Sequence, residues 1–434
     1  MSNLAFEEGP RHGDDQAAPA AAAAAPIDAA EVRPVPRISI QAFCESPDVT
    51  AVVEAAASDR RMARAHVKVH TGGIAAAAEF YQDAATPNLI MVETKLSHDK
   101  IDAELNRLAD VCDPGTKVIV IGHVNDVDLY RNLMRRGVSE YLVVPIDLLR
   151  VIKAIGDLYG ERAAKPLGRT LAFVGAKGGV GSSMVAHNVA WSIARNFHHD
   201  VVVADFDLPF GTAGLDFNQD PTQGIAEAIH SPDRLDDVFL DRLLARCSDH
   251  LSLLAAPATL DRTYDFDENT FVQVIDVAKS GVPAVVLDLP HGWTAWKKKT
   301  LLAADEVVIT AEPDLANLRN AKNIADLLRQ SRKNDSPPRL VLNKTGIAKR
   351  PEIKPDDFAS ALNLTPLAVI PFEAQVFGTA ANNGQMVAET DAKSPIAEHF
   401  DVIARAITGR AEVKRQKRGM LDPLLARLRG NKSA

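Results

Sequence analysis

Short apolar runs recur along the second half of the chain, and longer stretches with helical spacing separate them. Such runs, rich in Val, Ile and Leu, are typical of strands buried on both faces of a sheet. Strands that alternate with helices build a parallel sheet with helices on both sides. The pattern predicts a doubly wound α/β domain at about residues 167–409. Its strands are expected at residues 170–174, 201–207, 284–290, 306–312, 339–344 and 367–372.

The first half of the chain contains a second unit with the same alternation. Its helical stretches include residues 126–136 and 146–159. Strands that alternate with helices predict another doubly wound α/β domain, of the flavodoxin-like kind, at residues 37–160. Its five strands are expected at residues 38–43, 66–70, 88–92, 117–121 and 140–144.

Residues 1–36 and 410–434 lie outside both units and differ from them in composition. The first segment is rich in Ala and Pro and has no amphipathic face to bury, which predicts a disordered lead. It lacks the basic start and apolar core of a signal peptide, so we expect a cytoplasmic protein. The second segment mixes basic and apolar residues and can lie on an anionic membrane surface. A solvated tail, or a helix docked on a partner protein, explains it equally well.

Composition restricts the function further. A formal net charge of -8 argues against general nucleic-acid binding, although a local basic patch remains compatible with it. No run reaches the roughly 20 uninterrupted apolar residues that a membrane span requires. Cys44, Cys112 and Cys247 are too few and too widely separated for a zinc site or a disulfide framework. These features favour a protein of a reducing compartment that contacts a membrane peripherally, if at all.

A glycine-rich turn between the first strand and first helix of the second unit carries the strongest chemical signal. Three glycines within residues 178–181 allow backbone N–H groups to close around a polyphosphate, and the helix N-terminus adds partial positive charge. A regular phosphate-binding loop has a lysine where this chain has Ser182. Ser183 keeps the hydroxyl expected beside Mg²⁺, and Lys177 stands earlier in the loop. The turn predicts an anion site that lacks its usual cation.

Three carboxylates follow apolar strands of the same domain. Asp205 and Asp207 end one run, and their alternate positions predict that they share a face. Asp288 ends another run, in the form of a Walker B motif. A strand-end Asp is often only a turn residue. Three of them after a glycine-rich loop instead indicate a site for Mg²⁺ and water at the carboxyl ends of the strands.

This arrangement resembles the deviant Walker A ATPases of the MinD/ParA superfamily. The resemblance implies ATP and Mg²⁺ as ligands, and a homodimer in which Lys177 reaches the partner's nucleotide. It also implies that Asp207 positions the attacking water, that Asp205 is outer-shell to the metal, and that Asp288 holds it through water. The expected metal-binding residues are therefore Ser183, Asp205 and Asp288. The expected nucleotide-binding residues are Ala176, Lys177, Gly178, Gly179, Val180, Gly181, Ser182 and Ser183, with Asn343 and Pro371 beside the base.

The first unit resembles a response-regulator receiver domain, but its chemistry differs. A receiver has an acidic pair after its first strand, a phospho-accepting Asp after the third and a Lys beside the Pro after the fifth. This chain has Glu45 and Ser46, then Glu93, then Val144 before Pro145 at these places. Without the lysine, an acyl phosphate would lack its charge partner. The resemblance therefore predicts a pseudo-receiver that serves for contact and not for phosphotransfer.

A pseudo-receiver ahead of a MinD-like domain is similar to the CpaE/TadZ proteins of Flp-type tight-adherence pilus systems. The similarity rests on the altered loop, on residues 185–191, and on residues 287–291 before Trp293 and Trp296. It implies a polar, membrane-associated organiser of pilus assembly that recruits other parts of the machinery. Because phosphoryl transfer requires charge neutralisation at the β- and γ-oxygens, we expect ATP binding with weak hydrolysis at most.

Three other functions are compatible with the same residues. A ParA-type partition ATPase would share the fold but needs a basic face for DNA. Septum positioning of the MinD type is less favoured, because a receiver-like unit and a serine in the loop are not part of that pattern. A nucleotide-free scaffold is the strongest alternative, because the absence of lysine at position 182 can mark an inactive site.

Overall fold

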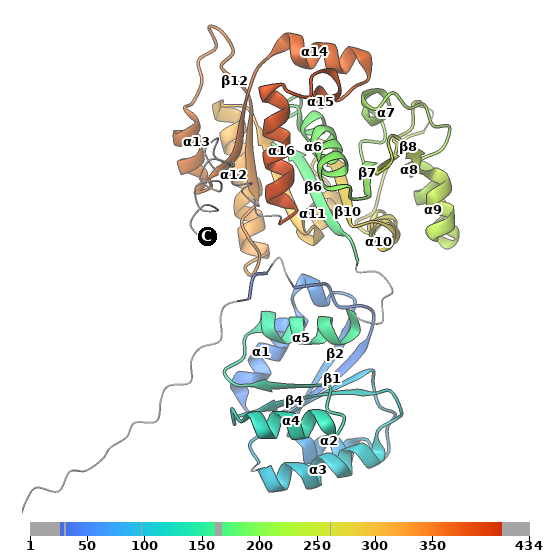
Figure 1. The fold of residues 1–434 in the computed structure, drawn as a ribbon, viewed down its shortest axis with the longest axis vertical. Coiled ribbons are helices and arrows are strands. Elements are labelled where there is room, and N and C mark those ends of the chain that lie inside the picture. The colour runs from blue at the N-terminus through green and yellow to red at the C-terminus, as the bar shows by residue number, and fades with distance from the viewer. Residues whose placement is uncertain (1–26, 30–31, 97, 161–166, 261, 410–434) are drawn as a thin grey trace, which may run out of the picture.

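Two α/β domains follow one another along the molecule in the computed structural model, which describes residues 27–29, 32–96, 98–160, 167–260 and 262–409 (Figure 1). Each domain has its own sheet, of five strands in the first and eight in the second. The predicted fold class, two doubly wound α/β domains, is confirmed.

The N-terminal domain is a parallel five-stranded sheet with the strand order β2-β1-β3-β4-β5, the flavodoxin-like order. Two helices pack on one face of the sheet and three on the other, so that apolar side chains fill both faces. The strands are β1 (Ser39–Cys44), β2 (His66–Thr71), β3 (Leu89–Thr94), β4 (Lys117–Gly122) and β5 (Glu140–Val143). The first face carries α1 (Pro47–Ala57) and α5 (Leu148–Gly160), and the second carries α2 (Ile74–Phe80), α3 (His98–Val111) and α4 (Val127–Arg135).

The predicted disordered lead overlaps this domain and needs a correction at its end. Val32 and Val35 are 5% and 0% exposed, and they belong to the core under α1 and α5. The backbone N–H of Val35 donates to the carbonyl of Arg61 at 2.8 Å. An Ala- and Pro-rich composition hid these two valines, which have no helical or strand periodicity around them. The predicted tail at residues 410–434 lies outside the described residues.

The C-terminal domain has an eight-stranded sheet in the order β13-β12-β11-β6-β10-β7-β9-β8. All neighbouring pairs are parallel except β8 with β9. The sequence did not indicate β8 and β9, because strands of two and four residues give almost no periodicity. The strands are β6 (Arg169–Gly175), β7 (Val201–Asp205), β8 (Ala245–Arg246), β9 (Leu251–Leu254), β10 (Ala284–Leu289), β11 (Glu306–Ala311), β12 (Arg339–Thr345) and β13 (Pro366–Pro371).

Helices cover both faces of the second sheet, and each face has its own apolar core. The central strand β6 lies between β10 and β11. The turn that follows β6 therefore lies at the carboxyl ends of the strands, in the middle of the sheet. One face carries α6 (Ser182–Phe197) and α16 (Pro395–Ile407), and the other carries α10 (Val272–Gly281), α11 (Ala295–Ala303), α12 (Leu315–Ser331) and α13 (Pro355–Leu362).

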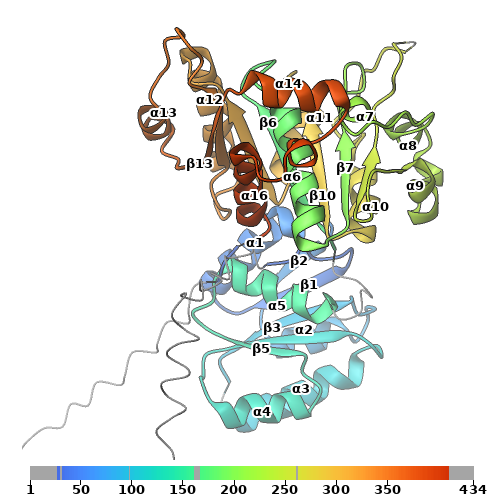
Figure 2. The same cartoon turned by 45° about the horizontal axis from the view of Figure 1, so that its top comes forward.

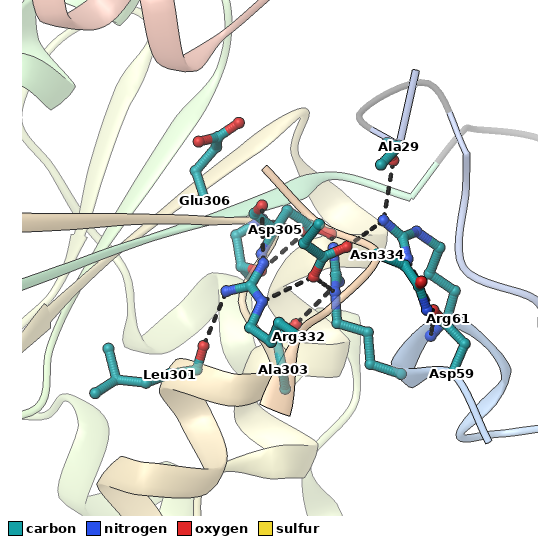
Figure 3. Close-up of polar contacts among 12 residues, drawn as sticks. Ala29, Asp59, Arg61, Leu301, Ala303, Asp305, Glu306, Arg332 and Asn334 are labelled. Carbon is teal, nitrogen blue, oxygen red and sulfur yellow. Dashed lines mark hydrogen bonds and ion pairs between the residues drawn. The ribbon is translucent and has the colours of Figure 1, made fainter. Parts of the chain in front are cut away.

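The two domains meet at the end of this sheet where β11 and β12 begin, and both views place α14 (Ala374–Asn383) at the far end (Figures 1 and 2). A short helix of the N-terminal domain, η1 (Arg60–Met62), lies at the contact. Arg60 binds Asp305 at 3.2 Å and Asp335 at 2.7 Å. Arg61 binds Asp59 at 2.9 Å and also pairs with Asp335 (Figure 3). We call Asp59, Arg60, Arg61, Asp305, Arg332 and Asp335 the interdomain ion cluster.

Candidate nucleotide site

The glycine-rich turn connects β6 to α6 as predicted, with β6 ending at Gly175 and α6 beginning at Ser182. Gly179 and Gly181 have φ angles of 81° and 84°, in the left-handed region that favours glycine. A side chain at position 181 would also lie 2.6 Å from the Asn343 amide nitrogen. Glycine at this position is therefore required both for the backbone conformation and for the approach of Asn343.

Donors from neighbouring elements hold the carbonyl oxygens of this turn. Asn320 Nδ2 on α12 donates to the Ala176 carbonyl at 2.9 Å, and Asn343 Nδ2 donates to the Val180 carbonyl at 2.8 Å. The Lys344 ammonium donates to the Gly179 carbonyl. By contrast, the backbone N–H groups of residues 177–181 donate to no atom in the described part of the chain. The carbonyls of Ala176, Gly179 and Val180 are held and the N–H groups of residues 177–181 are available, which suits an anion such as a phosphate chain.

The three predicted acids all lie at the carboxyl ends of β7 and β10, which are neighbours in the sheet. Asp205 is buried, and its carboxylate accepts hydrogen bonds from the backbone N–H groups of Asp207 (3.1 Å) and Ala213 (3.2 Å). Burial, together with the nearby charge of Asp288, raises the pKa of Asp205 to about 7. Burial also raises the pKa of Asp207, which lies past the end of the strand and is only partly covered.

Asp288 is paired with a buried histidine of the helix that follows the turn. His187 on α6 is fully buried, and its Nε2 lies 3.3 Å from Asp288 Oδ2. Its Nδ1 lies 2.8 Å from Asp216 Oδ2. Burial alone would lower the pKa of His187, but the two carboxylates outweigh it and raise the pKa to about 10. A buried imidazolium thus connects α6 with two acids beside the turn, and only the three-dimensional fold brings them together.

Lys297 is a second buried cation that the sequence did not single out. Its ammonium on α11 donates to the carbonyl of Pro290, in the segment that follows Asp288. Burial lowers the pKa of Lys297 to about 8, although Asp288 and Asp207 act in the opposite direction. The lysine has helical neighbours of the same charge, so its sequence context gave no sign that it turns inward.

Several buried polar atoms around the turn have no hydrogen-bond partner among the described residues. They are Ser182 Oγ, Asp288 Oδ1, Thr310 Oγ1 and Asn343 Oδ1. Buried polar atoms are nearly always satisfied, so a cluster of unsatisfied ones indicates a site that binds a polar ligand or water. The described residues contain no group of three or more His, Cys, Asp or Glu side chains arranged for a metal. A magnesium ion here would need oxygens from a nucleotide as well, which is how Mg²⁺ is usually bound.

The remaining predicted residues surround the same turn in different ways. Lys177 is exposed in the turn, and Ser183 lies partly covered in the first turn of α6. Pro371 ends β13 beside Thr345 of β12. Asn343, which the resemblance assigned to the adenine, directs its amide nitrogen to the loop, and its oxygen accepts no hydrogen bond from the described residues. Its role at the base therefore stays a prediction.

Comparison with known proteins defines the class first. No family model matches the chain. The septum site-determining protein MinD of Bacillus subtilis is 25% identical over 274 residues, which are 59% of this chain and 96% of that protein. A solved ParA family ATPase from Chlorobium tepidum is 26% identical, covers 54% of this chain and 98% of its own, and has a TM-score of 0.50. The C-terminal domain is of the MinD/ParA ATPase family.

The N-terminal domain is similar to a different group of solved structures. A solved structure of the pilus assembly protein CpaE from Caulobacter crescentus is 54% identical and covers 29% of this chain and 97% of its own, with a TM-score of 0.29. The N-terminal domain is thus similar in sequence to a CpaE pilus assembly protein, and the C-terminal domain is of the MinD/ParA ATPase family. None of its described helices is long and apolar enough to cross a membrane.

Proposed function

We propose that this protein is an ATP-dependent homodimer that organises the assembly of a Flp-type pilus on the inner face of the cytoplasmic membrane, at the cell pole. The observation that carries the proposal is the glycine-rich turn: neighbouring donors hold the carbonyls of Ala176, Gly179 and Val180, while the N–H groups of residues 177–181 donate to no described atom. The relationship to CpaE supports the pilus role, because that relative is a pilus assembly protein. Other proteins of the pilus machinery are the expected partners.

In the proposed complex the phosphates lie along the N–H groups of the turn and the N-terminus of α6. Ser182 and Ser183 contribute hydroxyls there, and the unpaired Oγ of Ser182 is consistent with a phosphate or water contact. Ser183, Asp205 and Asp288 would hold Mg²⁺, the last two through water, and the ion would neutralise charge on the phosphate oxygens. The unpaired Oδ1 of Asp288 fits a water of that ion. Asn343 and Pro371 would lie by the adenine.

Hydrolysis is expected to be weak. The turn has Ser182 where a regular loop supplies an ammonium to the β- and γ-phosphates. Lys177 is exposed, so it is available to reach the nucleotide of a second subunit. Asp207 is expected to position the attacking water. In this proposal ATP acts mainly as a dimerisation ligand, because it binds the dimer more tightly than the monomer.

Calorimetry with Mg·ATP tests the nucleotide site directly. The wild type is expected to bind, and a Lys177→Ala variant is expected to bind more weakly and to remain monomeric in size-exclusion chromatography with light scattering. Lys349→Ala is the matched control, because Lys349 is exposed and its side chain forms no hydrogen bond or ion pair with the described residues. The absence of heat from the wild type would contradict the site and favour a nucleotide-free scaffold. ATP hydrolysis at the rates usual for the MinD/ParA superfamily would contradict the interpretation of Ser182.

Peripheral membrane contact is proposed for residues 410–434, on the basis of their basic and apolar sequence. Sedimentation with liposomes that contain anionic lipid should recover more of the full chain than of a form that ends at Gly409. Equal recovery of the two forms would remove the membrane contact from the proposal. Nucleotide-dependent and salt-sensitive retention on DNA would instead favour a partition ATPase of the ParA type.

A further inference from the structure

The carboxyl end of β12 departs from regular strand geometry next to the glycine-rich turn. The pairing of β12 with β13 shifts register between Leu342 and Thr345. Within this shift Lys344 has a φ of 52°, in the left-handed region that is unfavourable for a residue other than glycine. Irregularities of this kind are frequent beside functional sites, where they redirect a side chain.

The irregularity directs two consecutive side chains to the same loop. In a regular strand Asn343 and Lys344 would point to opposite faces of the sheet. Here Asn343 Nδ2 donates to the Val180 carbonyl at 2.8 Å, and Lys344 Nζ donates to the adjacent Gly179 carbonyl. The unfavourable backbone conformation of Lys344 is thus coupled to a contact with the turn.

The ammonium of Lys344 is itself held in place. Its Nζ lies 3.1 Å from Glu312 Oε1, and the other carboxylate oxygen of Glu312 accepts from Arg350 at 2.7 Å. Arg350 also donates to the backbone carbonyl of Lys344. Glu312 and Arg350 therefore hold both the side chain and the backbone of Lys344 in the absence of a ligand.

A cation at a carbonyl oxygen acts on the whole peptide group. A charge-assisted hydrogen bond fixes the peptide between Gly179 and Val180, and the positive charge polarises its N–H group further. This N–H group is among those that no described atom uses. An anion at the turn would therefore meet a donor that is both oriented and strengthened.

We propose that Lys344 is a positioning residue that holds the glycine-rich turn in its anion-binding conformation and returns, within the same subunit, part of the positive charge missing at Ser182. The inference rests on the proposed function, because it takes the turn to bind ATP. It differs from the role of Lys177, which acts on the nucleotide of the second subunit. Lys344 acts through the peptide that it contacts and does not touch the phosphates.

Substitutions at Lys344 separate this role from a merely structural one. Lys344→Met removes the charge but keeps the length, and should weaken Mg·ATP binding about tenfold, the usual effect of losing a charge-assisted hydrogen bond. Lys344→Arg should restore most of the affinity. Lys344→Asn also removes the contact, but asparagine tolerates the left-handed backbone, so this variant should keep or raise the midpoint of thermal unfolding while its ATP affinity falls.

A matched control exists in the same segment. Lys349 also has a left-handed φ, of 64°, and its exposed side chain forms no hydrogen bond or ion pair with the described residues. Lys349→Met and Lys349→Asn should therefore bind Mg·ATP like the wild type. Hydrogen exchange of the 178–182 amides, measured without nucleotide, gives a second readout. It should be faster in Lys344→Met than in the wild type and unchanged in Lys349→Met.

The outcomes separate the inference from the proposed function. Wild-type ATP affinity and wild-type amide exchange in both Lys344→Met and Lys344→Asn would overturn the role of Lys344. If the wild type binds no Mg·ATP, the proposed function fails. The exchange measurement alone then decides whether Lys344 holds the turn in place. In that case faster exchange in the Lys344 variants supports it, and equal exchange overturns it.

Discussion

Replacing Asp335 should open the contact between the two domains. Its carboxylate is 5% exposed and accepts from Arg60 Nε and from Arg332 Nε, both at 2.7 Å, and it also pairs with Arg61 (Figure 3). The Arg61 side chain is 1% exposed. Burial alone would raise the pKa of Asp335, but the arginines outweigh it and keep the pKa below its ordinary value. An Asp335→Asn variant retains the shape and removes the charge.

The partners that the three arginines keep determine how much Asp335→Asn weakens the contact between the domains. Arg60 keeps Asp305 at 3.2 Å and Arg61 keeps Asp59 at 2.9 Å, whereas Arg332 keeps only carbonyl oxygens at 3.2 and 3.4 Å. Removing one member of a buried ion pair costs about 3–5 kcal/mol, because the other charge stays buried without compensation. Separation of the domains returns Arg60 and Arg61 to water. We therefore expect the variant to lose the interdomain contact before either domain unfolds.

Small-angle scattering of the full chain measures this directly, as a larger radius of gyration for Asp335→Asn than for the wild type. The three tryptophans all lie in the C-terminal domain, so their fluorescence during urea unfolding reports that domain. Asp326→Asn is the control, because Asp326 is 39% exposed and its surface pairs with Lys322 and Arg329 contribute only about 0.5 kcal/mol each. Unchanged scattering, with an unfolding midpoint equal to that of the control, would refute the reasoning.

Three further predictions follow from single contacts. The pKa of Asp305 is lowered from 3.8 to about 2, because Lys279, Arg60 and two bonds from Thr170 outweigh the effect of burial. Its contribution, about 2 kcal/mol, is therefore present above pH 4 and lost as the pH falls from 4 to 2, and acid unfolding of Asp305→Asn should lack this component. His187→Leu should lower the free energy of unfolding in urea by about 3 kcal/mol or more, because Asp216 and Asp288 lose their shared cation. A decrease of less than about 1 kcal/mol would contradict the buried ion pair. Gly181→Ala should lower the midpoint of thermal unfolding and the Mg·ATP affinity measured by calorimetry. The φ of residue 181 is 84°, and the new Cβ would lie 2.6 Å from the Asn343 amide nitrogen. Wild-type values for both quantities would show that the turn adapts to the side chain.

Most of the fold could be predicted because its signals are local. Val-, Ile- and Leu-rich runs indicated eleven of the strands, and the structure places all of them in two parallel sheets. The edge strand β8 and its neighbour β9 are too short to show a period. Val32 and Val35 were hidden by an Ala- and Pro-rich context, since single buried valines form no pattern.

The candidate site was predictable only where a short motif encodes it. The glycine-rich turn and the strand-end acids stand out in the sequence because they occur together: three glycines separate a strand from a helix, and acids end two later strands of the same domain. His187, Lys297 and Lys344 were not recognised as part of the site. Each becomes significant through contacts with residues distant in the chain, such as Asp216, Pro290 and Gly179. No spacing rule contains that information.

The ion cluster and the turn lie at opposite ends of the same two strands. At one end Thr170, in β6, donates its backbone N–H to Asp305 at 2.8 Å, just before β11 begins. At the other end the N–H of Ala176 donates to the carbonyl of Thr310 in β11 at 2.8 Å. A dimer that forms across the turn would therefore carry its receiver-like domains on its two outer ends, away from the nucleotides. In the proposed function, this arrangement leaves each receiver-like domain clear of the nucleotide site, so ATP would control how many such domains one particle carries.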